Sequence, residues 1–391
     1  ETNAYTITIR AADATGSTAA EFNAINSATS EAINASVVTS ISGTAADIAT
    51  LMSAAEQTAE FTATSFDLIA ATDGLSITGT TIDVTDLNNA ITRANTTSNN
   101  TVLATFASSQ GDITVNAGTI TEFESLLQLE TDSKINITGL NLTTTTVNVT
   151  QANNLTSKTT GTVTATVNAG TVNALTDLSA DGDNNAALSI TITDNSASAA
   201  DLNTINAATT VAVDATAIAT ISSSSLTDIS TLGAAITAGS IAATTAIGTI
   251  NVSGNAIDFT TLESEINRFD AFRIDPAVAV FTLADTTTVT LGTQDEVTAF
   301  LADVAANLVS VTGASQAVTV TPSGSGGVDI SHTDAIALAA AAGGTVTATI
   351  VNTTTVAQLA TLYDAGETNA YTITIRAADA TGSTAAEFNA I

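Results

Sequence analysis

Two hydrophobic patterns alternate along this chain of 391 residues. Segments such as 5–9 and 162–167 alternate threonine with an apolar residue, which predicts β-strands with one apolar face and one hydroxyl-bearing face. Between such segments lie stretches of about two turns, such as 19–25, in which apolar residues recur at helical spacing. Helices this short are unstable alone, so we expect them to form by packing on neighbouring segments.

A polar signal marks the start of each predicted helix. A Ser or Thr is followed three residues later by Glu, Gln, Asp or Asn, so that both side chains can bond to free backbone N–H groups of the first turn. Twelve starts, 21 to 41 residues apart, fill 366 residues, and Thr171 is an imperfect member because Ala174 lies where the polar partner is expected. The predicted caps are Thr18, Thr44, Thr85, Thr121, Thr150, Thr171, Ser198, Ser225, Thr260, Thr293, Ser331 and Thr355, and the signal returns at Thr384.

The chain repeats itself over a long distance. Residues 1–25 and 367–391 are identical, letter for letter. We interpret residues 1–366 as one full period and residues 367–391 as the start of the next identical period. Duplication of the ends of a single domain is the alternative. In the first case the numbering begins at an arbitrary point of a longer protein.

These patterns predict the fold class. We expect a repeat solenoid: a parallel β-solenoid with a short capped α-helix in most coils, about twelve coils in the 366-residue period. Helices pack less closely than strands, so the coils are expected to curve or twist into a superhelix. The last coil equals the first, and no polar capping coil is visible. We therefore expect the partner to be the chain itself, stacked head to tail through the first and last coils.

Three segments carry a resemblance to known proteins. Residues 41–48, 162–167 and 202–213 resemble repeats of very large secreted and surface β-solenoid proteins of marine cyanobacteria and other aquatic bacteria. The resemblance implies an extracellular or cell-surface, non-enzymatic protein. Such proteins often carry glycine-rich calcium nonapeptides, which this sequence lacks.

Composition and charge exclude several classes of protein. Hydrophobic residues make up 44 % of the chain, which is too many for a disordered protein. Seven Lys and Arg against 38 Asp and Glu leave a net charge of −31, so no basic face can bind nucleic acid. Cysteine is absent, which excludes disulfides and thiolate metal sites. The longest uncharged run, 335–363, is interrupted by glycine and threonine, so we expect no membrane insertion.

One segment partly matches a calcium-binding loop. Asp181, Asp183 and Asn185 follow the opening of such a loop, but Ala186 replaces the glycine and Ile192 the bidentate glutamate. These three residues are weak calcium candidates, and a polar turn is the default reading. We expect no cofactor beyond loosely bound calcium, which a strongly acidic surface attracts without a designed site.

The single histidine does not predict an enzyme. His332 lies between Ser331 and Asp334, but the three are sequence neighbours at a predicted helix start, whereas a catalytic triad meets across a pocket.

Two acid pairs raise the same question, because a glycoside hydrolase needs two carboxylates across one bond. They are Glu122 with Glu124, and Glu263 with Glu265. Glu124 and Glu263 occupy predicted capping positions, so we expect structural roles for them and no catalytic residues.

The function expected from the sequence is structural. We expect a subunit or segment of an extracellular filament built by head-to-tail stacking of coils, either as one giant chain or as non-covalent subunits. The alternative is the stalk or ligand-binding region of a large bacterial surface adhesin, with loops such as 72–85 and 323–331 as contact sites. A polysaccharide lyase or hydrolase and an ice-binding threonine ladder are weaker alternatives, because histidine and arginine are scarce and coil lengths vary.

Overall fold

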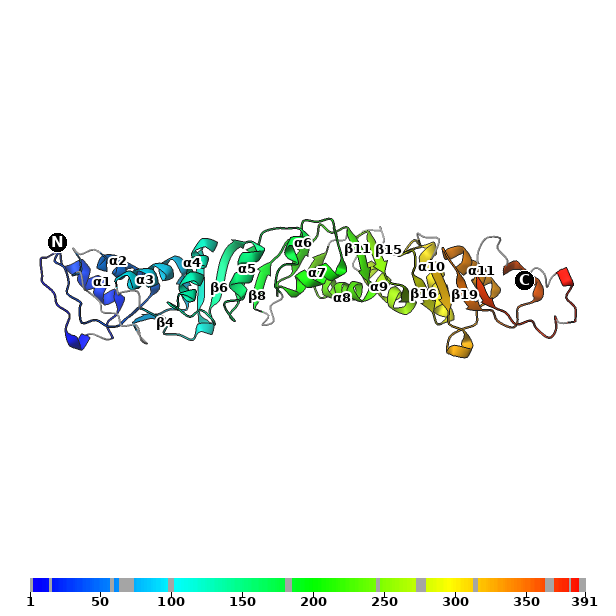
Figure 1. Ribbon diagram of the computed structural model, residues 1–391, viewed down its shortest axis with the longest axis horizontal. Helices are drawn as coiled ribbons and strands as arrows, with labels where there is room; N and C mark the ends of the chain where they lie inside the picture. Colours follow the sequence, from blue (N-terminus) through cyan, green and yellow to red (C-terminus); the bar gives the residue numbers. More distant parts are fainter. Residues whose placement is uncertain are drawn as a thin grey trace. The chain divides into compact units, whose positions relative to one another are not determined.

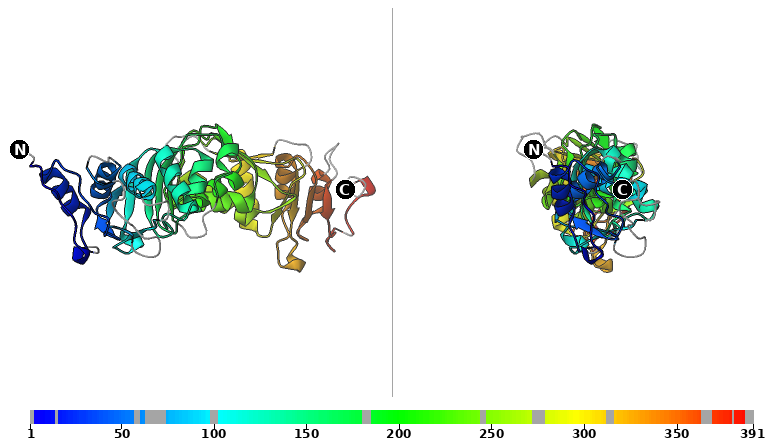
Figure 2. Two further views of the ribbon diagram at one scale, coloured as in Figure 1. Left: turned by 60° about the vertical axis from the view of Figure 1, so that its left-hand side comes forward. Right: turned by 90° about the vertical axis from the view of Figure 1, so that its left-hand side faces the viewer.

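The computed structural model describes residues 3–13, 16–56, 60–62, 74–97, 102–179, 185–243, 247–271, 279–311, 316–362, 369–379 and 381–386. Two compact units are present. Unit 1 comprises Glu1–Ala169, Asp177–Thr191 and Ala207–Val211, and unit 2 comprises Gly170–Thr176, Ile192–Asn206 and Ala212–Ile391. Within each unit the helices and strands labelled in Figure 1 follow one another in chain order, and the sequence colours of Figure 2 show the same succession.

Twelve α-helices lie in the described residues, separated by one or two strands in most coils. Their bounds are α1 (Ala19–Ala28), α2 (Ala45–Ala55), α3 (Val84–Thr97), α4 (Ile120–Thr131), α5 (Val149–Thr156), α6 (Val172–Leu175), α7 (Ala199–Ala207), α8 (Leu226–Thr237), α9 (Phe259–Ala271), α10 (Gln294–Ala305), α11 (His332–Ala341) and α12 (Val356–Leu359). Short 3-10 helices are η1 (Ala11–Asp13), η2 (Gln110–Asp112), η3 (Ser323–Ser325) and η4 (Ala360–Leu362).

Unit 1 contains two parallel sheets, with strand orders β1-β2-β4 and β3-β5-β6-β7-β8. The strands are β1 (Ile41–Gly43), β2 (Leu75–Ile77), β3 (Thr81–Asp83), β4 (Ala104–Phe106), β5 (Thr114–Gly118), β6 (Asn141–Val147), β7 (Val163–Val167) and β8 (Ala186–Ser189). Neighbouring strands come from successive coils: Val163 of β7 pairs with Ala186 of β8, 23 residues later. Buried and exposed residues alternate along β7, as the threonine pattern predicts.

Unit 2 contains three parallel sheets, with strand orders β10-β12, β17-β15-β13-β11-β9 and β14-β16-β18-β19-β20. The strands are β9 (Ser196–Ala197), β10 (Val213–Ala215), β11 (Thr220–Ser225), β12 (Ile241–Ala243), β13 (Thr249–Ser253), β14 (Ala256–Asp258), β15 (Val280–Leu283), β16 (Thr288–Leu291), β17 (Val309–Val311), β18 (Ala317–Val320), β19 (Val346–Thr349) and β20 (Ala370–Thr372).

The expectation of a single parallel β-solenoid is wrong. The described strands form five separate parallel sheets of two to five strands, and with the helices they make a mixed α/β fold. Strands of one coil enter different sheets: β2 pairs with β1 and β4, whereas β3 pairs with β5. Packed helices need axes ~8–10 Å apart and neighbouring strands ~4.8 Å, so the helices cannot follow one uninterrupted ladder. Register shifts within the β5–β6, β6–β7 and β11–β13 pairs interrupt the stacking further.

Most predicted helix starts are confirmed. Eight predicted caps lie immediately before their helices, which are α1, α2, α6, α7, α8, α10, α11 and α12. The side chain of each cap except Thr171 of α6 accepts a hydrogen bond from a backbone N–H. The thirteenth signal, at Thr384, has its partner Glu387 outside the described residues.

Four predicted starts are two residues too late. The true caps are Asp83 for α3, Thr119 for α4, Asn148 for α5 and Asp258 for α9. Three of the four are Asp or Asn, whose side-chain oxygen accepts from the first turn as well as a hydroxyl does. Because the sequence analysis searched only for Ser and Thr at the cap, it missed Asp83, Asn148 and Asp258.

Candidate functional site

The predicted calcium ligands do not form a described site. Asp181 and Asp183 lie outside the described residues. Asn185 is buried, and its side-chain amide donates to the Thr159 carbonyl at 2.7 Å, which ties it to the preceding coil. Across the described ranges, no three His, Asp or Glu side chains are grouped closely enough to hold a metal ion.

His332 is the first residue of α11 and is half-buried. Ser331, the cap of that helix, accepts the Asp334 N–H at 3.1 Å and donates its hydroxyl to the Asp334 carboxylate at 2.8 Å. The two other members of the suggested triad therefore bond to each other as a helix start. This is the arrangement of a cap rather than of a nucleophile with its base.

The first acid pair belongs to contacts between helices. The capping carboxylate of α4 is Glu122, not Glu124 as expected: it accepts the Thr119 N–H at 2.7 Å. Glu124 instead accepts the side-chain amide of Gln151, in α5, at 2.8 Å. A second contact to Glu122 comes from α3, whose Thr85 hydroxyl donates at 2.5 Å. The Thr85 and Thr119 hydrogen bonds hold the pKa of Glu122 below its ordinary value.

The second acid pair is also structural. Glu263 is not a capping residue, because α9 is capped by Asp258. Glu265 is only 2 % exposed; it accepts the Ser230 hydroxyl of α8 at 2.9 Å and lies 3.1 Å from the Arg268 guanidinium. The Glu265–Arg268 contact is an ion pair without hydrogen-bond geometry. Three of the four acids, Glu122, Glu124 and Glu265, thus accept hydrogen bonds from neighbouring helices.

The turn at 323–331 closes on itself. Asp329 accepts the backbone N–H of Ser323 at 2.9 Å and its hydroxyl at 2.7 Å. These two hydrogen bonds lower the pKa of Asp329, the backbone bond being the larger cause. The backbone N–H and the hydroxyl of Ser323 are thus both bonded within the turn.

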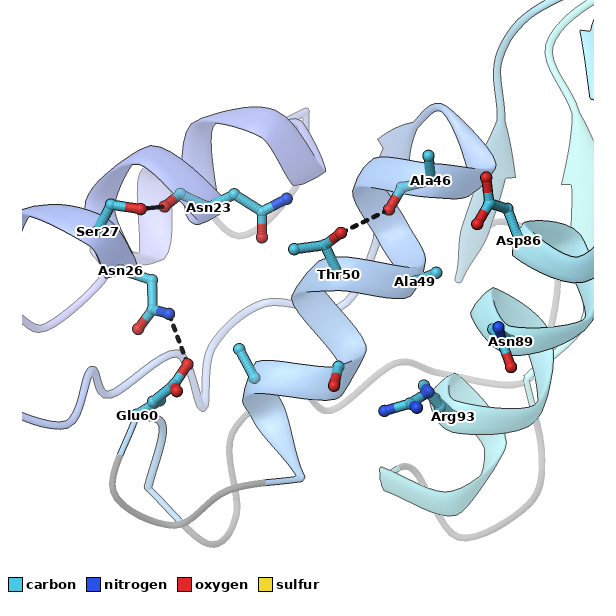
Figure 3. A pocket seen from close by; sticks show the side chains of 12 residues that line it. Asn23, Asn26, Ser27, Ala46, Ala49, Thr50, Glu60, Asp86, Asn89 and Arg93 are labelled. Atoms are coloured by element: carbon cyan, nitrogen blue, oxygen red, sulfur yellow. Dashed lines mark hydrogen bonds between the residues drawn. The ribbon is translucent and has the colours of Figure 1, made fainter. Parts of the chain in front are cut away.

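A groove of about 510 Å³ lies over α1, α2 and α3 in unit 1 (Figure 3). At one side Glu60 accepts the Asn26 side-chain amide at 2.7 Å. At the other, Arg93 is paired with Glu56 at 2.9 Å. Burial raises the pKa of Asp86 in the lining, with Asp83 as a second cause. Small side chains of α2, such as Ala49, line the middle of the groove.

A recurring asparagine links successive coils, and sequence reasoning missed it. In α1, α3, α5 and α7 the fifth residue after the cap is Asn, and its side-chain amide donates to a backbone carbonyl of the next coil at 2.7–3.0 Å. Three acceptors belong to the first turn of α2, α4 and α8, and the fourth, the Asp177 carbonyl, lies two residues after α6. The four residues are Asn23, Asn88, Asn153 and Asn203. The signal in the sequence is the constant spacing from each cap.

Replacing Asn88 by alanine is expected to lower the free energy of unfolding by about 1 kcal/mol, the usual value of a hydrogen bond whose acceptor is left behind. The bond lost is the one to the Glu122 carbonyl, 2.7 Å long. Asn89 is the matched control, since it is exposed on the same helix and its alanine variant is expected to change stability by less than about 0.5 kcal/mol. Urea unfolding followed by circular dichroism measures both. Equal effects at the two positions would contradict the coil-linking role.

The second copy of the repeated segment binds strand β19. Its strand β20 pairs with β19 in parallel, with Ala348 opposite Tyr371. The Ile350 N–H donates to the Thr372 carbonyl at 3.0 Å. The Tyr371 hydroxyl donates to the Ala335 carbonyl of α11 at 3.2 Å. The segment is thus bonded to both the strand and the helix of the preceding coils.

The same copy also covers the start of α12. Arg376 and Asp379 form an ion pair, with Nε and Oδ2 2.7 Å apart, and the Asp379 carboxylate lies near the backbone N–H of Val356, the first residue of α12. The hydrogen bond from Arg376 is the main cause that lowers the pKa of Asp379; the charge of Arg376 and the nearby Val356 N–H lower it further.

The first copy bonds to its neighbour through the opposite edge. The Ile9 N–H donates to the Asn34 carbonyl at 2.9 Å, and the Asn34 N–H donates to the Ile7 carbonyl at 3.0 Å. Alternate residues of a strand in a parallel ladder direct their backbone groups to opposite neighbours. The edge that carries Thr6, the equivalent of Thr372, therefore faces away from the following coil.

No family model, no curated protein and no solved structure matches this chain. Among the helices of the described residues, none combines the length and the apolar character needed to cross a membrane.

Proposed function

We propose that this chain is a repeating structural segment of an extracellular protein, in which each 366-residue period joins the next through the 25-residue coil. The observation that carries the proposal is that the two identical occurrences of this coil bond through opposite edges: one through Ile7 and Ile9, the other through Thr372. A single coil can therefore use both edges at once, between the end of one period and the start of the next. Such a coil leaves no open strand edge at the joint.

The proposed partner is the chain's own sequence, continued head to tail. The net charge of −31 supports an exposed, self-repelling surface that stays soluble. In the described part of the chain Arg10, Arg93, Lys158, Arg268 and Arg376 form ion pairs with acids of the same chain. The extracellular placement rests on the resemblance of the repeats, and we propose a structural rather than an enzymatic role.

Adding whole periods tests the proposal. Chains with one, two and three 366-residue periods, each ending in the repeated coil, are compared by small-angle X-ray scattering and limited proteolysis. We expect each added period to raise the maximum dimension by the same increment. We also expect the joint coil to resist protease as well as the internal coil at 185–210 does.

The control is a two-period chain with Thr→Pro at the joint, at the position equivalent to Thr372 of the single-period chain. This change removes a backbone donor from the strand and is expected to expose the joint to protease. A native joint that is cleaved as fast as this control would overturn the proposal. Specific binding of glycans, without a constant increase in maximum dimension for each added period, would instead favour the adhesin stalk.

A further inference from the structure

The acceptor motif of N-glycosylation, Asn-X-Ser/Thr, occurs nine times in this chain. In a sequence so rich in threonine the motif recurs by composition, so its presence alone selects no site. A site also needs an asparagine amide and a hydroxyl that an enzyme can reach, in a surface loop. The asparagines of the motif are Asn34, Asn95, Asn99, Asn136, Asn141, Asn148, Asn154, Asn251 and Asn352, of which Asn99 lies outside the described residues.

Three of these asparagines use their amide nitrogen inside the fold. Asn95 is 6 % exposed, and its Nδ2 donates at 2.9 Å to a carbonyl of its own helix. The Nδ2 of Asn141 donates at 3.0 Å to a carbonyl of the preceding coil, and that of Asn251 does so at 3.1 Å. A sugar on any of these nitrogens would displace a contact that the folded chain makes.

Three further motifs hold their hydroxyl or their backbone in a folded element. Asn148 is the cap of α5, so its motif runs into the first turn of that helix. In the motif of Asn154, the Thr156 hydroxyl donates at 3.2 Å to two carbonyls of α5. In the motif of Asn352, Thr354 is only 5 % exposed. None of the three presents both groups in an open loop.

Asn136 presents both groups. It lies in the loop between α4 and β6, and its side chain and that of Thr138 are exposed. The Asn136 Oδ1 accepts the Thr138 N–H at 2.9 Å, which fixes the two residues in a turn. Its Nδ2 takes part in no hydrogen bond among the described residues. The nitrogen that would carry a sugar is therefore the part of this side chain that the fold leaves unused.

The preceding coil holds this turn in place. The Gln110 side-chain amide donates to the Asn136 carbonyl at 2.8 Å, and its Oε1 accepts the Gly139 N–H at 3.1 Å. Both bonds involve backbone groups on the inner side of the turn, so a sugar on Nδ2 disturbs neither.

The same turn occurs at two other corners of the chain. Asn34 accepts the Ser36 N–H at 3.1 Å, but Asn34 is half-buried. Asp214 accepts the Thr216 N–H at 3.0 Å and has no amide. Of these three corners, only the one at Asn136 offers an exposed amide nitrogen.

We propose that Asn136 is a site of N-linked glycosylation. The inference rests on the proposed extracellular placement and adds a covalent modification that the joining of periods does not require. The donor is a sugar that carries a phosphate leaving group on its anomeric carbon. The Asn136 Nδ2 attacks this carbon: the C–N bond forms and the C–O bond to the phosphate breaks. The phosphate leaves with the electron pair, and one amide proton passes to the transferase.

One peptide compares four of the nine motifs. Trypsin cleaves after Lys134 and Lys158, and no Lys or Arg lies between them. Peptide 135–158 carries the motifs of Asn136, Asn141, Asn148 and Asn154. In the full chain from its own source, we expect mass spectrometry with fragmentation that retains sugars to find a glycan on Asn136 and none on the other three. A single sugar indicates a nucleotide-sugar donor, and an oligosaccharide indicates a lipid-linked donor.

Thr138→Ala and Thr138→Ser, made in the same source, are the matched variants. Thr138 is bonded through its backbone, whose carbonyl accepts the Thr160 N–H at 2.6 Å, so neither change removes a described side-chain bond. We expect the glycan to be lost in Thr138→Ala and kept in Thr138→Ser.

Three results would overturn the inference: an unmodified Asn136 in the wild type, sugars on the other asparagines of the peptide, or a glycan that persists in Thr138→Ala. None of them bears on the covalent joint, which is tested by adding periods to chains made without a transferase.

Discussion

Replacing Phe300 by alanine lowers the free energy of unfolding by about 3–5 kcal/mol, the usual cost of removing a buried phenylalanine. The Phe300 side chain is fully buried in unit 2 and meets the edge of Phe259, with ring centroids 5.6 Å apart and an interplanar angle of 87°. The variant loses apolar burial and the aromatic pair together. Urea unfolding followed by circular dichroism measures the loss.

Ile336 provides the control for Phe300. It lies on α11 in the same unit and is 41 % exposed, so Ile336→Ala is expected to change stability by less than about 0.5 kcal/mol. A double-mutant cycle with Phe259→Ala should give a coupling energy of about 0.5–1.5 kcal/mol for the aromatic pair. A loss below about 1 kcal/mol for Phe300→Ala would mean that α10 is not packed as described.

Replacing Arg268 by methionine is expected to cost about 3 kcal/mol, because it leaves a buried carboxylate without its counter-ion. Glu265 is 2 % exposed, and the Arg268 side chain, 32 % exposed, is its ion-pair partner. Methionine retains most of the apolar stem that packs near Gly233 of α8, so lost packing contributes little. The measurement is again the free energy of unfolding from urea titration.

The double variant Glu265→Gln with Arg268→Met separates charge from packing. Glutamine keeps an acceptor for the Ser230 hydroxyl and carries no charge, so the double variant should recover about 2 kcal/mol relative to Arg268→Met. If the two variants are equally unstable, the cost comes from packing and the buried ion pair is not its cause.

Helix starts show how far sequence reasoning reached. The capping signal located most starts because its hydrogen bonds are local and need no tertiary contact. In α4 the signal was ambiguous, since Thr119 with Glu122 and Thr121 with Glu124 both satisfy it. The chosen register buries Phe123 and places Glu122 against Thr85 of α3. The burial of Phe123 and the contact of Glu122 with Thr85 both depend on neighbouring coils, so the local pattern could not select between the two helix starts.

The links between coils were harder to find. An asparagine on a helix surface is expected to be solvated unless the neighbouring helix is known, and the sequence analysis placed the cap of α3 at Thr85, so the five-residue spacing that separates Asn88 from Asn89 was not visible. Only the first donates to the next coil. Residues 161–166 and 344–349 share the sequence Gly-Thr-Val-Thr-Ala-Thr. The sequence alone does not show that the strands they contain, β7 and β19, pair in the same register with β8 and β20.

By itself the sequence determined the identity of residues 1–25 with residues 367–391, the alternation of threonine-rich strands with short capped helices, and the net charge of −31. These follow from periodicity, local hydrogen bonding and charge, which act within a few residues of the chain. The tertiary structure alone decided that the strands divide among five sheets and that the repeated coil bonds through opposite edges in its two copies. Both depend on which backbone groups meet across coils and on the unequal spacing of helices and strands, and neither is encoded in a local pattern.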